Sequence, residues 1–296
     1  METFFQTLAT GIMMGSLYSL VGMGVVVIYK STEVFNFAQG GLVMLGAYLA
    51  WSFMEEVGMP VWLALISTAA AGVLIGIIIE RFGMRKLVGQ PIISLIIITL
   101  ALQAFINGVV TLFWGDRASN AFPQSFIPPI PVELFGINLS LQQIVTFAVS
   151  MTMMIIFILF FKYIKWGLDL RAVAEDHQAA MCMGISTRMV FILAWVLSCV
   201  LAFTGGVLIG TIHGVNTTMY EIGEKSFPVV LLGGLESIPG VLMAGVIIGV
   251  LEFMCGQYLD PIVGASTTDI VPYIILLLVL IIKPHGLFGL KRIERV

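Results

Sequence analysis

Charged residues are scarce in this sequence. Only 10% of its 296 residues are Asp, Glu, Lys or Arg, and 59% are hydrophobic, whereas about 25% of an average soluble domain is charged. Catalytic signatures are also missing: there is no HExxH, GxSxG or Cys/His cluster, and the glycine-rich run at 233–240 lacks the Gly-Lys-Ser/Thr ending of a phosphate-binding loop. We therefore expect an integral membrane protein with no catalytic residues, no cofactor of its own and no ATPase activity.

Cysteine is equally sparse. Cys182, Cys199 and Cys255 are odd in number, fall in or beside apolar segments and lack the spacing of metal ligands. We interpret them as packing residues and expect no metal site.

Long apolar runs, by contrast, are abundant. About 18 or more apolar residues are needed for a helix to cross roughly 30 Å of hydrocarbon, and uninterrupted runs exclude the alternating strands of a barrel. We predict an all-α fold, a polytopic transmembrane helical bundle that forms a single domain over 1–296. It has eight to nine spans, some of them discontinuous. The predicted spans are 8–29, 35–53, 61–79, 91–114, 141–161, 189–212, 239–255 and 270–282, with a broken crossing within 213–235.

The basic residues predict the orientation. If the loops alternate, eight of them share the side of the segment 162–188, and this side is cytoplasmic by the positive-inside rule. The basic tail must reach the same side, which is why 213–235 has to supply a crossing. The amino terminus is then outside and the carboxyl terminus is cytoplasmic. The eight are Lys30, Arg81, Arg85, Lys86, Lys162, Lys165, Arg171 and Arg188; the tail adds Lys283, Lys291, Arg292 and Arg295, and Arg117 and Lys225 stay outside.

Two amides and two glycines open the second span. A helix interrupted beside amides frees backbone groups that can hold a substrate in a transporter. The alternative is a capping and close-packing role. The candidate pathway residues here are Asn36, Phe37, Gln39, Gly40 and Gly41.

A polar stripe marks the fourth span. Thr99, Gln103 and Asn107 recur every four residues and so share one helix face. We expect this face to point into the bundle, toward a solute route or toward hydrogen-bonding neighbours without a ligand. His213, Asn216 and Thr217, at the end of a later span, could line an entrance, or His213 could be an ordinary interfacial residue.

Other features have simpler interpretations. Gly11, Gly15 and Ser19, and later Gly245 and Gly249, recur every four residues and favour close helix packing. Glu236 and Glu252 can be placed at span ends, where water reaches them, so we do not expect proton coupling. The proline-rich loop 115–140 suits a docking surface or lid, or a stiff connection.

The segment at about 163–188 is the one long charged helix pattern. A solvent-exposed amphipathic helix of a membrane protein can bind a soluble partner, so we expect this segment to do so. It contains the pattern Gln-Ala-Ala followed, after three residues, by Gly. This pattern resembles the coupling loop with which permeases of ATP-binding-cassette (ABC) importers bind their ATPases, where Glu-Ala-Ala is the usual start. We expect one rigid helix over 171–186. The candidate coupling residues are Arg171, Glu175, Asp176, Gln178, Ala179, Ala180 and Gly184.

Nearly the whole chain resembles the permeases of branched-chain amino-acid ABC importers. The resemblance rests on VFNFAQGGLVMLGAY (34–48), RAVAEDHQAAMCMGIS (171–186), FPVVLLGGLESIPGVLMAGVIIGVLE (227–252) and LIIKPHGLFG (280–289). It implies a pore-forming subunit in the bacterial inner membrane. It also implies partners: a second, similar permease in a heterodimer, two ATPases that use ATP and Mg, an external or periplasmic solute-binding protein, and membrane lipid but no nucleic acid.

One departure from the family pattern widens the choice of solute. Many members have His and Glu where this chain has Gln39 and Gly41. Relatives of the family carry urea, short amides or aromatic acids, which are the alternative substrates. An alternative function from a different class is an ion-coupled carrier or channel that acts alone, which would need a coupling carboxylate deep within a span. A third alternative, a membrane scaffold or enzyme, is supported by no feature of the sequence.

Overall fold

The computed structural model describes residues 2–87, 90–115, 122–123, 126–134, 137–264, 266–283 and 286–289, and most of them are helical. In chain order the elements are α1 (Glu2–Thr32), α2 (Gln39–Glu55), α3 (Val61–Ile78), the π-helix η1 (Ile79–Gly83), the 3-10 helix η2 (Met84–Leu87), α4 (Ile92–Trp114), β1 (Pro131–Leu134), β2 (Ile137–Ser140), α5 (Leu141–Tyr163), α6 (Lys165–Glu175), α7 (His177–Cys182), α8 (Thr187–His213), α9 (Met219–Glu224), α10 (Ser226–Gly233), α11 (Ile238–Val263) and α12 (Val271–Ile282).

The predicted all-α transmembrane bundle is confirmed. Within the described ranges, six helices are long and apolar enough to cross a membrane: α1, α3 with its continuation to Leu87, α4, α5, α8 and α11. The remaining predicted crossings are short or broken. With 17 residues, α2 falls just below span length, α12 has 12, and the predicted discontinuous segment 213–235 holds two short helices, α9 and α10, that meet at Lys225.

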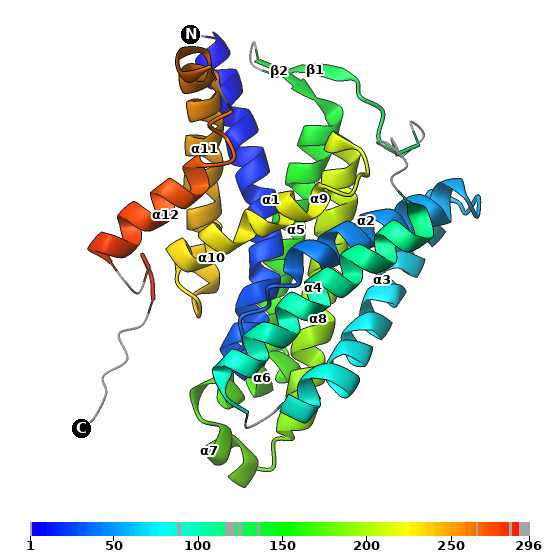
Figure 1. The fold of residues 1–296 in the computed structure, drawn as a ribbon, viewed down its shortest axis with the longest axis vertical. Coiled ribbons are helices and arrows are strands. Elements are labelled where there is room, and N and C mark those ends of the chain that lie inside the picture. The colour runs from blue at the N-terminus through cyan, green and yellow to red at the C-terminus, as the bar shows by residue number, and fades with distance from the viewer. Residues whose placement is uncertain are drawn as a thin grey trace.

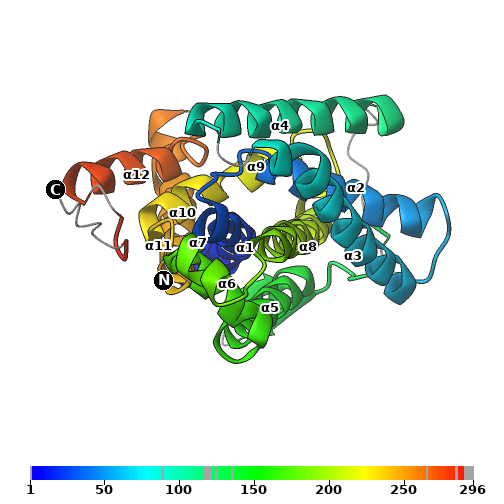
Figure 2. The ribbon, with the colours of Figure 1, turned by 90° about the horizontal axis from the view of Figure 1, so that it is seen from below.

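The bundle is built around α1 and α8, which the other helices surround (Figures 1 and 2). Small residues let α1 approach α11 closely. A Cβ atom on Gly15 would lie 2.3 Å from the carbonyl oxygen of Gly245, and one on Gly249 would lie 2.3 Å from that of Gly11. The predicted small-residue stripes therefore face each other and serve close packing.

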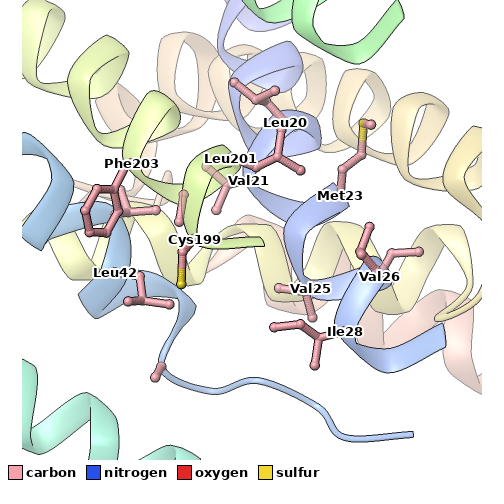
Figure 3. Close-up of a cluster of buried hydrophobic side chains, with 14 of the residues drawn as sticks. Leu20, Val21, Met23, Val25, Val26, Ile28, Leu42, Cys199, Leu201 and Phe203 are labelled. Atoms are coloured by element: carbon pink, nitrogen blue, oxygen red, sulfur yellow. The ribbon is translucent and has the colours of Figure 1, made fainter. Parts of the chain in front are cut away.

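A buried apolar cluster joins α1, α2 and α8 (Figure 3). Leu20, Val21 and Val25 of α1 meet Leu42 of α2 and Phe203 of α8, all nearly or fully buried. The cluster includes Cys199, so its predicted packing role is confirmed. For Cys182 that prediction is wrong, because the side chain is exposed at the end of α7.

The chain reverses sharply between α1 and α2. Glu33, just beyond α1, has a left-handed backbone with φ of 56°, and residues 33–38 run back along α1. The Gln39 Nε2 at the start of α2 donates to the carbonyl of Val21 at 3.1 Å, and Val21 lies eleven residues, about 16 Å, before the end of α1. The second helix therefore begins beside the middle of the first.

The loop between α4 and α5 contains a short antiparallel hairpin that the sequence did not predict. Its strands pair Pro131 with Ser140 and Leu134 with Ile137, and the Gln6 Nε2 of α1 donates to the carbonyl of Asn138 at 3.1 Å. The predicted docking surface or lid over 115–140 falls partly outside the described residues, and Arg117 does so entirely.

Basic residues gather at one end of the bundle. The eight predicted to share a side lie at the ends of α1, α5 and α3 with its continuation, in α6, and at the start of α8. Figure 1 shows these parts together at the lower end, with α6 and α7. The distribution agrees with the predicted positive side, while Lys291, Arg292 and Arg295 lie outside the described residues.

A buried ion pair corrects the interpretation of Glu252. This residue lies in the middle of α11 and is 2% exposed, so it is not at a span end. Its Oε1 is 2.7 Å from Lys225 Nζ and 3.3 Å from the Tyr18 hydroxyl. Lys225 Nζ also lies 3.0 Å from Asp269 Oδ1. The sequence pattern missed this pair because its members are brought together only by the packing of α11 on the α9–α10 break.

Candidate functional site

The Asn36 segment forms a buried polar cluster at the start of α2. Gln39 Oε1 accepts from Asn36 Nδ2 at 3.0 Å and from the Ser198 hydroxyl of α8 at 3.0 Å. Asn36 Oδ1 accepts from the backbone N–H of Ala38 at 3.1 Å. Asn36, Gln39 and Ser198 are all fully buried, so three amide or hydroxyl groups are held together inside an apolar bundle.

The polar stripe of α4 completes this cluster. Gln103 Oε1 accepts from the backbone N–H of Gly41 at 2.7 Å, and the Thr99 hydroxyl donates to the carbonyl of Ile96 at 2.9 Å, with that of Phe35 at 3.4 Å. The stripe therefore points inward, as predicted. We call Asn36, Gln39, Gln103 and Ser198 the amide cluster.

Two polar atoms beside the amide cluster have no hydrogen-bond partner among the described residues. They are Gln103 Nε2, a donor, and Asn107 Oδ1, an acceptor one turn further along α4, and both atoms are buried. Buried polar atoms are nearly always paired, and the exceptions call for an explanation such as a ligand or a bound water. A donor and an acceptor on one helix face could together hold a polar solute.

Close packing also accounts for the glycines of this segment. A Cβ atom on Gly40 would lie 2.5 Å from the carbonyl oxygen of Tyr220 in α9, and one on Gly41 would lie 2.6 Å from Gln103 Oε1. Only glycine lets α4 and α9 approach the start of α2 so closely. The Phe37 ring lies 5.7 Å from that of Phe227 at the start of α10, so it anchors the reversal to the second broken segment.

Ser198 is the cluster member that sequence reasoning missed. It is a single serine within an apolar span, and such a residue alone carries no signal of a site. Its partner Gln39 lies 159 positions away, so only the tertiary fold brings them together.

His213, Asn216 and Thr217 are not part of the amide cluster. His213 ends α8 fifteen residues after Ser198, which is about 22 Å along the helix. Asn216 Oδ1 accepts from the backbone N–H of Thr218 at 3.1 Å and from its hydroxyl at 2.8 Å, just before α9 begins. The structure thus gives Asn216 a turn-forming contact, while an entrance role for the three residues stays a prediction.

A cavity of about 370 Å³ lies between the end of α1, η1 and η2, the start of α4, α7 and α8. Val34 and Leu95 line it, two residues before Asn36 and one turn before Thr99. His177 and Met181 of α7 also line it, and its polar lining includes the bound pair of Glu80 and Arg85. The cavity therefore has residues of the predicted coupling segment in its wall, together with residues close in sequence to Asn36 and Thr99.

The coupling segment differs from the single rigid helix that we expected. It holds two short helices, α6 and α7, separated at Asp176. Asp176 has an extended backbone, and its Oδ1 accepts from the N–H groups of Gln178 at 2.8 Å and Ala179 at 2.9 Å. This N-cap starts α7 in a new direction. The N–H groups of Ala179 and Gln178 also lower the pKa of the Asp176 carboxyl.

The candidate coupling residues differ in how much of each is exposed to solvent. Glu175, Asp176, Gln178 and Ala179 are exposed, and Arg171 is half-buried with its Nε unpartnered among the described residues. Ala180, by contrast, is 4% exposed and packs into the chain's own core, so we correct its expected place in the docking face. Gly184 has φ of 81° with open space beside its Cα, so it is needed for the turn after α7.

Comparison with known proteins gives consistent matches over most of the chain. Residues 7–280 match the family described as "Branched-chain amino acid transport system / permease component". The chain is 30% identical to the high-affinity branched-chain amino acid transport system permease protein LivH of Salmonella typhimurium, over 99% of this chain and 98% of that protein. It is also 30% identical to the corresponding permease protein BraD of Pseudomonas aeruginosa, with the same coverage.

A solved structure shares the fold. PsaBC from Streptococcus pneumoniae, in complex with Fab, superposes with a TM-score of 0.51 at 13% identity, covering 96% of this chain and 92% of that chain.

Proposed function

Because this chain belongs to the family of branched-chain amino acid transport system permease components, we propose that it carries branched-chain or related hydrophobic amino acids across the bacterial inner membrane. It is a pore-forming permease subunit and a multi-pass membrane protein. The observation that supports a solute route through it is the amide cluster, which lies where α2 begins beside the middle of α1.

The amide cluster has the chemistry for a small polar head group. Gln103 Nε2 can donate to a carboxylate and Asn107 Oδ1 can accept from an ammonium group, since both atoms are buried without a partner among the described residues. In the low dielectric of a bundle such bonds are strong when made and costly when left unmade. A solute that satisfies both atoms is therefore favoured over an apolar one.

The energy comes from partner subunits in this proposal. Two ABC ATPases, which bind ATP and Mg, would contact the exposed residues of α6 and α7, and this end would face the cytoplasm with its basic residues. The amino terminus would lie outside and the carboxyl terminus inside. A solute-binding protein would deliver the amino acid from the other side to a heterodimer of this chain and a second, similar permease. Because the segment bends at Asp176, two short helices rather than one long helix would form the contact with the ATPases.

Reconstitution into liposomes tests the proposal. The full complex, with the binding protein outside and ATP at the ATPases, should accumulate labelled leucine, and unlabelled isoleucine and valine should compete. Gln103→Leu should lower the initial rate roughly five- to a hundredfold, because it removes the partner of the buried Gly41 N–H and the free donor. Gln257→Leu, on the exposed side of α11, is the matched control and should transport normally.

Other outcomes would assign other functions. Competition by urea, short amides or aromatic acids, without competition by isoleucine, would replace the proposed substrate. Uptake by this chain alone, driven by an ion gradient without ATPases, would refute an ATP-driven importer.

A further inference from the structure

The cavity beside α7 contains a buried charged pair that the proposed transport site does not use. Glu80 is 1% exposed. Its Oε1 accepts from Arg85 Nε at 3.0 Å, and its Oε2 accepts from Arg85 Nη2. Both residues line the cavity of about 370 Å³, within the range of small-molecule sites, about 300–1,000 Å³.

Charges of both signs remain available to a ligand at this wall. The bonds to Glu80 use two of the five N–H donors of a guanidinium group, and the Arg85 side chain is 24% exposed. Each carboxylate oxygen of Glu80 has a second lone pair that can accept a further bond. The pair is neutral as a whole, so a ligand with one positive and one negative group fits it without leaving a net charge buried.

The rest of the wall is mainly apolar. Met84, Leu95, Phe191 and Trp195 line the cavity, and the fully packed Trp195 is 1% exposed. Such a surface favours an aliphatic side chain, because burying apolar area is favourable at about 25 cal/mol per Å². A charged pair at one wall and an apolar pocket around it match the two halves of a hydrophobic amino acid.

One wall of the cavity belongs to the coupling segment. His177 and Met181 of α7 line it, and the His177 ring packs edge-on against Phe191 at 5.8 Å between ring centroids. A ligand in the cavity would therefore contact the helix that we assign to the ATPases. Val34 and Leu95 also line the cavity, two residues before Asn36 and one turn of α4 before Thr99.

We propose that this cavity is an inner binding site for a zwitterionic aliphatic amino acid, with the carboxylate on Arg85 and the ammonium group on Glu80. Occupancy of the site restrains α7 and slows further import. The solute class rests on the proposed function, since the amino acid that occupies this cavity would be the one that the permease carries.

Direct binding tests the site without transport. The purified complex of permeases and ATPases, in detergent and without the binding protein, should bind radiolabelled leucine saturably in equilibrium dialysis. Isopentylamine and 4-methylpentanoate, which each carry only one of the two charges, should compete at least tenfold more weakly. Arg85→Met should weaken leucine binding about tenfold or more, since it removes a charge-assisted contact.

A second variant separates binding from folding. Leu95→Trp fills the cavity and leaves the charged pair in place, so it should also weaken binding at least fivefold. Ile97→Trp is its matched control, because Ile97 lies on the outward face of the same helix and is 59% exposed. Unchanged binding in both Arg85→Met and Leu95→Trp would overturn the inner site.

Transport then tests the restraint on α7. Leucine loaded inside the liposomes, on the side of the ATPases, should slow ATP-driven uptake of labelled valine, and Arg85→Met should need about tenfold more internal leucine for the same inhibition. If uptake is normal and internal leucine does not slow it, the proposed restraint of α7 is refuted, while the proposed function is unaffected. If no aliphatic amino acid is taken up, the proposed function fails, and the dialysis result still decides the inner site.

Discussion

Replacing Lys225 by methionine should destabilise the bundle because it leaves a carboxylate buried without its cation. Lys225 Nζ is 2.7 Å from Glu252 Oε1, and the Glu252 side chain is 3% exposed. After the replacement, the Tyr18 hydroxyl at 3.3 Å still donates to that oxygen, and Glu252 Oε2 has no partner among the described residues. One neutral hydrogen bond cannot replace an ion pair in a low dielectric.

The expected size follows from the burial of the two groups. Removing one partner of a buried ion pair costs about 3–5 kcal/mol, and the lower half of that range applies because the Lys225 side chain is 13% exposed. A change of 1 kcal/mol shifts the midpoint of a chain of 150–250 residues by about 2–4 °C. We therefore expect the melting temperature of Lys225→Met to fall by roughly 6–16 °C.

The double variant Lys225→Met with Glu252→Met provides the decisive comparison. Removing both charges replaces the pair with apolar side chains, which is often neutral, so its melting temperature should return close to that of the natural protein. The assay heats the detergent-solubilised complex, with a fluorescent tag on this chain, and follows the intact peak in size-exclusion chromatography. Lys162→Met, an exposed lysine at the end of α5, is the control. Additive losses in the double variant would refute the ion-pair argument.

Two further predictions concern helix packing and the coupling segment. Gly245→Leu should prevent folding, because even a Cβ atom there would lie 2.5 Å from the carbonyl oxygen of Gly15. The control Gly108→Leu should be tolerated, since no atom lies within 4 Å of a Cβ atom at that position. Equal yields of the two variants in size-exclusion chromatography would contradict the α1–α11 contact. The pKa of Asp176 is lowered by the N–H groups of Ala179 and Gln178, so its cap is fully present above the ordinary carboxyl pKa and is lost only as the pH falls through the lower folded value. Co-purification of the ATPases should therefore stay constant from about pH 8 to about pH 5. Asp176→Asn should retain this co-purification, and Asp176→Ala should lose it. Loss of co-purification between about pH 7 and pH 6 in the natural protein alone would show that a titratable group other than Asp176 controls the contact.

Long elements could be predicted from the sequence because each has its own local signal. The run 141–161 became α5 over Leu141–Tyr163, and 91–114 became α4 over Ile92–Trp114. Apolar length alone decides such spans in lipid, since their backbone groups must be paired within the helix. The inward direction of Thr99 and Gln103 followed from the same reasoning, because a polar stripe on an apolar helix has to face protein.

The features that the sequence did not predict depend on distant partners or on one side chain. The break between α6 and α7 follows from a cap formed by Asp176, while the helical pattern continues on both sides of it. Ser198 meets Gln39 across 159 positions, and Lys225 meets Glu252 across 27. No periodicity encodes such contacts, so residues that looked like isolated polar positions became members of clusters.

The two broken segments of the bundle pack against each other beside the amide cluster. A Cβ atom on Gly223 of α9 would lie 2.8 Å from Gly40 Cα at the start of α2, so these two backbones are in direct contact. Two residues after Gly223, Lys225 ties the same segment to Glu252 of α11. Because these backbones are already in contact, α2 cannot shift toward α9 unless α9 moves with it or the ion pair is strained. The buried ion pair thus limits one direction of movement at the start of α2 from outside the amide cluster.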